Sequence, residues 1–183
     1  MGNVDLHEQA RGEFRRILSG VTDDQLSSAT PCTDWDVRAL IGHVINGNYQ
    51  FAAISRGEQP EYPSGTYDVV ATYDASAKEA EAAFGADGVT ERIFDLPFGQ
   101  IPGEIAIGIH ATDIVTHSWD LAKATGQKAD LPDDLVAPLL QLARMFPDSP
   151  ELRGPGGPFA PRVECSDGAP LLEQLVAQLG RQP

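Results

Sequence analysis

The sequence is poor in basic residues and lacks any long apolar run. It carries 13 Lys and Arg against 27 Asp and Glu, which gives a formal net charge of -14 in 183 residues. This negative charge argues against nucleic acid and against an anionic membrane surface, because both attract Lys and Arg. No apolar run approaches the ~20 residues of a transmembrane helix. We therefore expect neither a nucleic-acid nor a membrane partner.

Cysteine is also scarce, and several catalytic motifs are missing. Cys32 and Cys165 are far apart and form no CxxC pair. The first residues show no signal-peptide pattern, so we expect a cytoplasmic protein with free thiols. The sequence contains no GxGxxG, no P-loop, no GxSxG elbow and no HExxH, so it gives no sign of those nucleotide-binding, hydrolase or metalloprotease classes.

Apolar periodicity dominates what is present. It predicts helices over the ranges 5–18, 34–56, 67–84, 104–125, 132–145 and 170–179. A capping box from Thr33 to Asp36 is expected to open the second helix, and Gly126 to end the fourth. Residues 85–103 predict a small extended or hairpin connection, and residues 149–161 an irregular surface segment. We predict an all-α bundle in a single domain over residues 1–183.

The segment 109–121 is the most informative part of the chain. His110, Asp113 and His117 follow one another at i, i+3 and i+7, within about 60° of arc on a helix. The same stripe carries apolar residues, so it is predicted to face inward, with Thr112 and Thr116 on the other side. Ionisable groups aimed at an apolar interior are costly unless they are compensated, and a metal ion compensates them well.

A metal site needs ligands from more than one element, and His43 supplies one from the second helix. Asp113 and His117 are one turn apart, so both can bind one ion. With His43 they form a set of two histidines and one carboxylate, which leaves coordination positions open for water or substrate. The simpler alternatives are a satisfied core histidine at His43 and a hydrogen-bonded Asp113–His117 couple that joins two helices.

The other histidines are assigned different roles. His110 is either a further ligand or a residue that orients a ligand or shuttles a proton, and we favour the second. His7, among polar neighbours near the N-terminus, is expected to lie on the surface.

Several residues near the predicted ligands carry weaker expectations. Trp35 and Trp119 are interpreted as core packing. Asp36 shares the stripe of His43 and is favoured over Asp120 as a group that orients a ligand. Cys32 is interpreted as a small buried residue in preference to a thiol of lowered pKa at a helix start.

Two stretches resemble a known family. The run Thr-Pro-Cys-Thr-Asp-Trp-Asp-Val-Arg-Ala-Leu-Ile-Gly-His-Val over residues 30–44 is similar to the first signature of actinobacterial DinB-like proteins. These are relatives of the N-terminal domain of mycothiol-dependent maleylpyruvate isomerase. The run from Asp113 through His117-Ser118-Trp119-Asp120-Leu121 to Gly126 resembles the second signature, and residues 175–183 resemble the ending of short members.

This resemblance implies a four-helix DinB-like bundle that binds a divalent metal, zinc foremost and nickel second. The family's metal positions map onto His43, Asp113 and His117. Aspartate stands at the second position, where the isomerase carries glutamate. We do not expect the isomerase's further C-terminal domain in a chain of 183 residues, so maleylpyruvate itself is not the expected substrate.

The resulting hypothesis is a metal-dependent thiol transferase or isomerase that uses mycothiol, or a similar small thiol, and an electrophilic substrate. His110 is its candidate catalytic residue. The alternative is a non-catalytic metal-binding or stress-related interaction module, and a third interpretation is a metal-free bundle. We expect a monomer or a homodimer.

Overall fold

The computed structural model describes residues 1–97, 99–153 and 159–183 and is mostly helical. In chain order, with η marking 3₁₀ helices, its elements are α1 (Asn3–Leu18), η1 (Asp23–Ser27), α2 (Val37–Arg56), α3 (Val69–Phe84), η2 (Val89–Glu91), β1 (Ile93–Leu96), β2 (Gly99–Pro102), α4 (Gly103–Thr125), α5 (Asp133–Arg144), α6 (Pro150–Arg153) and α7 (Leu171–Gln178). The predicted all-α class is confirmed. Within the described residues, no helix combines the length and apolarity needed to cross a membrane.

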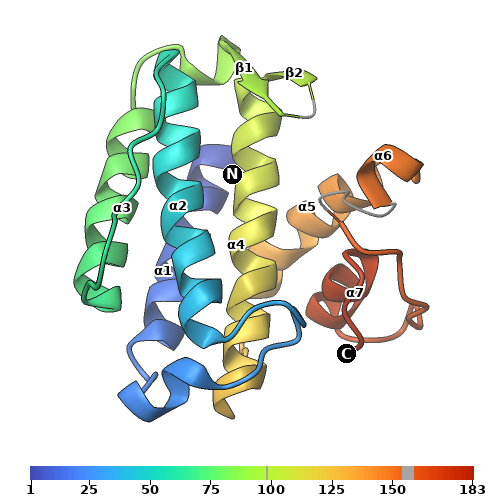
Figure 1. Cartoon of the computed structure of the whole chain (residues 1–183). Helices are drawn as coiled ribbons and strands as arrows, with labels where there is room; N and C mark the ends of the chain where they lie inside the picture. Colours follow the sequence, from blue (N-terminus) through green and yellow to red (C-terminus); the bar gives the residue numbers. More distant parts are fainter. Residues whose placement is uncertain (98, 154–158) are drawn as a thin grey trace. The chain divides into compact units, whose positions relative to one another are not determined.

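Helices α1 to α4 form a bundle in which α1 and α4 run one way and α2 and α3 run the other (Figure 1). The starts of α1 and α4 are joined by hydrogen bonds between Asn3 and Glu104. Asn48 of α2 bonds to Ser76 of α3 at 3.0 Å in the buried centre. The long connection between α2 and α3 lets these neighbours lie parallel, so α2 and α4 are antiparallel across the bundle.

The chain groups into two compact units, Met1–Ala129 and Asp130–Pro183. The four-helix bundle lies in the first unit, and α5 packs against α7 in the second. Within the predicted irregular segment, residues 150–153 form the short helix α6, while residues 154–158 lie outside the described part of the chain. The single domain over residues 1–183 stays a prediction.

Helix α4 is buried on nearly all sides, and the expectation that Thr112 and Thr116 face solvent is wrong. Their exposures are 1% and 2%. Each hydroxyl donates to the carbonyl four residues earlier, Thr112 to Gly108 and Thr116 to Thr112, both at 2.8 Å. A threonine whose hydroxyl is satisfied inside its own helix can be buried without losing a hydrogen bond. Hydropathy alone therefore misassigned that side of the helix.

Helix α2 begins later than its capping-box prediction. Asp36 has an extended backbone, and its Oδ1 accepts a 2.8 Å hydrogen bond from the amide of Ala39. The side chain therefore caps the helix and satisfies an amide that lacks an intrahelical partner. Because Asp36 is exposed in this role, it does not lie on the inward stripe of His43, and its assignment as a ligand-orienting group is wrong.

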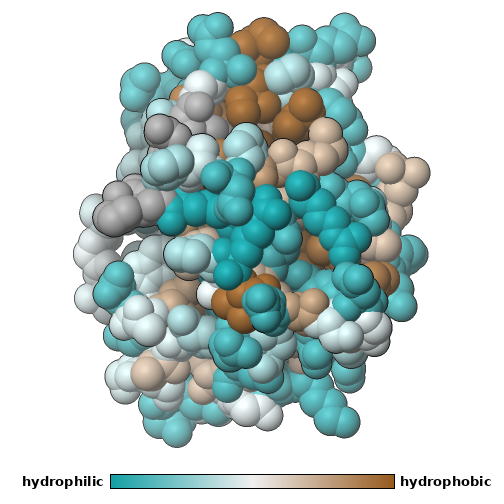
Figure 2. Space-filling view, turned by 90° about the vertical axis from the view of Figure 1, so that its right-hand side faces the viewer, coloured by the Kyte–Doolittle hydropathy of each residue, from teal (hydrophilic) through white to brown (hydrophobic). Residues whose placement is uncertain are grey.

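The predicted extended connection is confirmed as the hairpin of β1 and β2, with Phe94 opposite Ile101. Phe94 and Leu96 are buried under the end of the bundle, while Ile93 and Ile105 remain exposed at 58% and 39%. Figure 2 shows a mostly hydrophilic face with apolar side chains gathered at the end that carries the hairpin. Residue 98 lies outside the described residues.

Candidate functional site

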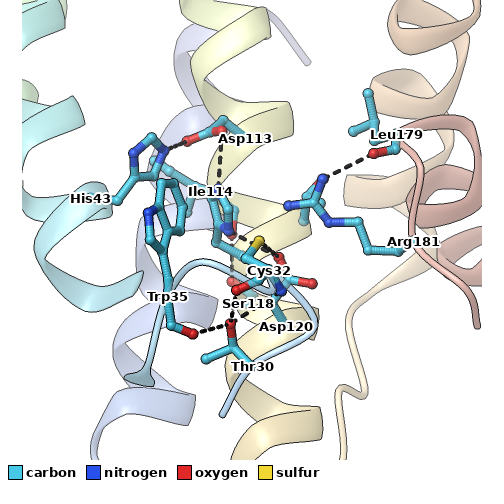
Figure 3. A network of polar contacts seen from close by, with 12 residues as sticks. Thr30, Cys32, Trp35, His43, Asp113, Ile114, Ser118, Asp120, Leu179 and Arg181 are labelled. Carbon is cyan, nitrogen blue, oxygen red and sulfur yellow. Dashed lines mark hydrogen bonds and ion pairs between the residues drawn. The ribbon is translucent and has the colours of Figure 1, made fainter. Parts of the chain in front are cut away.

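The antiparallel pairing of α2 and α4 brings His43, Asp113 and His117 together. Figure 3 shows the contact between His43 and Asp113. The Oδ2 atom of Asp113 lies 3.2 Å from Nε2 of His43, and its Oδ1 atom lies 3.3 Å from Nε2 of His117. The side chains of His43 and Asp113 are 37% and 33% exposed, whereas that of His117 is 4% exposed. The cluster therefore has a buried inner side and an outer side that is open to solvent.

The spacing of these three donors suits a metal ion. One donor atom from each residue lies within 4.8 Å of the other two. A tetrahedral ion with bonds of about 2.0–2.1 Å keeps its donor atoms about 3.4 Å apart. Each histidine Nε2 lies at a similar distance from one oxygen of Asp113, 3.2 Å from Oδ2 for His43 and 3.3 Å from Oδ1 for His117. Imidazole and carboxylate donors suit Zn²⁺ and other first-row divalent ions. Three protein donors leave room for a further ligand on the open side.

The other ring nitrogen of His117, Nδ1, contacts a second carboxylate on the side of the ring that faces away from Asp113. Nδ1 lies 3.0 Å from Oδ2 of Asp120, a carboxylate with no solvent exposure. When Nδ1 donates to this carboxylate, Nε2 is directed at Asp113 and His43. A carboxylate in this position fixes the ring of a metal-binding histidine and raises its basicity. This is the role that the sequence analysis gave to Asp36 in preference to Asp120.

The charges in the cluster balance one another. Burial by itself raises the pKa of Asp113, but His117 and His43 outweigh it and hold that pKa well below its ordinary value. Burial by itself lowers the pKa of His117, but the charge of Asp113 and the hydrogen bonds that Asp113 and Asp120 accept from the ring raise that pKa well above 6.5. Without a metal, the raised pKa of His117 favours the form that carries a proton on each ring nitrogen, beside the two carboxylates. A cation bound at Nε2 must displace the proton on that atom.

Trp35 forms one wall of the site, so core packing was an incomplete description of it. Its ring centroid lies 4.6 Å from that of His43 and 5.6 Å from that of His117. Beside His43, a cavity of about 570 Å³ is bounded by Trp35, Arg38, Asn46 and Tyr67. A small molecule in this cavity would contact one edge of the histidine cluster. Trp119, in contrast, is buried, as predicted.

His7 is buried beside His110, so the expected surface position is wrong. The two rings hydrogen-bond through Nε2 of His7 and Nδ1 of His110 at 2.9 Å, and both residues are 1% exposed. Arg11 donates to Nδ1 of His7 at 3.1 Å. Because Arg11 can only donate, His7 carries its proton on Nε2 and donates to His110, whose own proton is then on Nε2. His110 therefore belongs to a second, neutral histidine pair deeper in the bundle.

The signals for the missed residues were partly available. His7 precedes Ala10 and Phe14 by the same i+3 and i+7 spacing that placed His110 inward, and Arg11 follows it by one turn. Asp120 follows His117 by one turn as well. Cys32 had no such signal, because its Sγ reaches Oδ2 of Asp120 at 3.3 Å across 88 residues of sequence.

Comparisons with known proteins concern the family and the fold of the chain. Residues 7–122 match the family described as mycothiol maleylpyruvate isomerase N-terminal domain. Two relatives from Mycobacterium tuberculosis, the uncharacterized proteins MT0763 and Rv0738, are each 42% identical over 177 residues, which is 96% of this chain and 95% of theirs. The crystal structure of the mycothiol-dependent maleylpyruvate isomerase superposes with a TM-score of 0.63 at 16% identity, covering 77% of this chain and 68% of that one. A histidine-to-alanine mutant of that isomerase also gives 0.63, at 14% identity and with the same coverage.

Proposed function

The chain belongs to the mycothiol maleylpyruvate isomerase N-terminal domain family, and from this premise we propose that it is a metal-dependent thiol transferase or isomerase. The cosubstrate is a low-molecular-weight thiol of the mycothiol type, and the substrate is a small electrophile. One observation carries the proposal: two histidines and one carboxylate, a set of donors suited to a metal ion, meet on facing helices with one side open beside a cavity. Because it uses a small reduced thiol, we place the activity in the cytoplasm.

In this proposal His43, Asp113 and His117 hold the ion, with Zn²⁺ preferred and Ni²⁺ second. Bound there, the ion lowers the pKa of a coordinated thiol below its free value of about 8.5, so that the thiol reacts as thiolate. Asp120 keeps the ring of His117 in the binding orientation through the 3.0 Å contact with Nδ1. The buried side of His117 excludes water from the inner half of the site.

In this proposal the cavity beside His43 binds the electrophilic substrate. Trp35 offers a flat apolar face next to His43. Arg38 and Tyr67 line the same cavity, and a guanidinium attracts an anionic substrate group and can bind a carboxylate through two hydrogen bonds. The described lining contains no Asp or Glu, although the chain as a whole is strongly acidic. We therefore assign the electrophile to the cavity, with any anionic group directed at Arg38.

His110 receives a supporting role in this proposal. It lies one turn before Asp113 on α4, and the hydrogen bond of its Nδ1 goes to His7. Its ring stacks on Phe51 of α2 with centroids 4.3 Å apart, which joins the helix of Asp113 and His117 to the helix of His43. We therefore assign it to positioning the ligand helix.

The test is turnover by the full chain, reconstituted with Zn²⁺ or Ni²⁺, with mycothiol and a panel of electrophiles that includes maleylpyruvate. We expect thiol-dependent turnover that requires metal and falls at least about a hundredfold in His43→Ala, since the ion loses a ligand. Lys78→Ala, on the exposed side of α3, is the control and should keep full activity.

A protein that binds about one ion through His43 and yet turns over no thiol-electrophile pair would contradict the enzyme proposal. That result would establish the alternative, a non-catalytic metal-binding module.

A further inference from the structure

A second set of metal-binding donors lies on the opposite edge of the His117 ring. Cys32, His117 and Asp120 each offer one donor atom, and these atoms lie within 4.8 Å of one another. Oδ2 of Asp120 is 3.3 Å from Sγ of Cys32 and 3.0 Å from Nδ1 of His117. We propose that these three residues form a separate seat for a thiophilic cation, distinct from the one formed with His43 and Asp113.

The loop before α2 presents Cys32 to α4 in a fixed way. The buried hydroxyl of Thr30 accepts from the amide of Cys32 at 3.1 Å and donates to the carbonyl of Trp35 at 2.9 Å. The amide of Trp35 donates to the carbonyl of Cys32 at 2.8 Å. The backbone around Cys32 is therefore closed into a turn whose hydrogen bonds are satisfied internally, while the thiol reaches Asp120 (Figure 3). This contact gives the Thr-Pro-Cys segment a specific partner on α4.

The donor set selects the kind of ion. One sulfur, one imidazole nitrogen and one carboxylate oxygen suit Zn²⁺, Co²⁺ or Cd²⁺ and disfavour Mg²⁺ and Ca²⁺, which prefer oxygen alone. A tetrahedral ion with an M–S bond of about 2.3 Å and M–N and M–O bonds of about 2.0–2.1 Å needs donors about 3.4–3.6 Å apart. The separations of 3.0 and 3.3 Å require an expansion of only a few tenths of an ångström. His117 and Asp120 are fully or nearly fully buried and Cys32 is half-buried, so the seat is open only on the loop side.

The two seats exclude each other while His117 is a neutral imidazole, because a neutral ring has a single free lone pair. A cation on Nδ1 leaves the proton on Nε2, which then donates to Asp113 across 3.3 Å. A cation on Nε2 leaves the proton on Nδ1, which donates to Asp120. The proposed seat thus goes beyond the proposed function, because an ion on Cys32 removes His117 from the site with the open positions.

Cobalt(II) titration of the full reduced chain tests the seat, because a Co²⁺–thiolate bond gives a near-ultraviolet charge-transfer absorption. His43→Ala weakens the first seat and leaves the second one complete. We expect Co²⁺ to produce the charge-transfer band in His43→Ala protein. The band should be lost when Cys32→Ser is added and retained when Cys165→Ser is added instead, since Cys165 is the other cysteine of the chain.

Absence of the band in His43→Ala protein that retains its helical circular dichroism would overturn the proposal, as would a band that survives Cys32→Ser. The proposed function is tested separately, by measuring turnover in Cys32→Ser protein. Cys32→Ser alone leaves His43, Asp113 and His117 in place, so metal-dependent thiol turnover in that variant is independent of the cysteine seat.

Discussion

Two buried histidines on α4 are expected to differ in charge because of what lies beside them. His117 has a carboxylate at each ring nitrogen, and its pKa is raised well above 6.5 despite burial. For His110, burial is the main cause that lowers the pKa to about 4, and the more distant charge of Asp113 only partly opposes it. Burial also lowers the pKa of its partner His7, with His110 and Arg11 adding to the effect. The same residue type thus serves as a paired cation in one place and as a neutral hydrogen-bonding group in the other.

The lowered pKa of His110 predicts that the folded protein loses stability in mild acid. The folded-state pKa of His110, about 4, lies below its unfolded value near 6.5, so the unfolded chain binds more protons in that interval. Stability present above pH 6.5 is therefore lost as the pH falls from 6.5 towards 4, by up to about 3 kcal/mol from His110 alone. Urea midpoints measured by circular dichroism across this range should record the fall.

His7→Gln provides the comparison, because glutamine can still accept from Arg11 and donate to His110 but does not titrate. Its urea midpoint should depend less on pH between 6.5 and 4 than that of the parent. Parallel pH curves for the two proteins would show that His7 does not contribute to the acid response.

At the level of the elements, α2 and α4 approach closely at Gly47. A Cβ added there would lie 2.9 Å from Nε2 of His110, whose ring also stacks on Phe51 with centroids 4.3 Å apart. The glycine therefore lets the two helices that carry His43, Asp113 and His117 meet at this distance. His43 lies one turn before Gly47, and Asp113 lies one turn after His110.

Gly47→Ala is predicted to destabilise the bundle by about 1–3 kcal/mol, because the inserted methyl overpacks a buried contact. Gly12→Ala on α1 is the matched control: it is an exposed helical glycine with nothing within 4 Å of the added Cβ. There the same substitution should stabilise by about 0.5–1 kcal/mol through helix propensity and loss of chain entropy. Equal effects of the two substitutions on denaturant midpoints would contradict the close approach.

The elements are also where sequence reasoning succeeded best. Apolar periodicity located the bundle helices, and Gly126, with φ 69°, ends α4 as expected because it adopts the left-handed conformation. The start of α2 was displaced because Asp36 uses its own side chain as the cap. Periodicity also predicted that His43 and Asp113 lie close together, because it placed both on inward-facing stripes of long helices. It could not place Cys32, whose position depends on a loop turn and on a contact 88 residues away.

For the whole molecule, the strongly acidic composition and the local chemistry point in different directions. The formal charge is -14, whereas the cavity beside His43 is bounded by Arg38 and aromatic side chains. From the bulk charge we expect neither a nucleic-acid partner nor an anionic membrane surface, and this stays a prediction. The proposed binding of a metal ion and a small substrate depends instead on a few side chains that the bundle brings together.

The most direct test of the account is the metal content of untagged full-length protein, measured by plasma mass spectrometry beside His117→Ala and the Lys78→Ala control. His117 contributes to both proposed seats, so its removal should abolish binding. We predict about one equivalent of a transition metal in the parent and in the control, and its loss in His117→Ala. A parent that holds no metal even after reconstitution, or a His117→Ala protein that holds as much as the parent, would contradict the account.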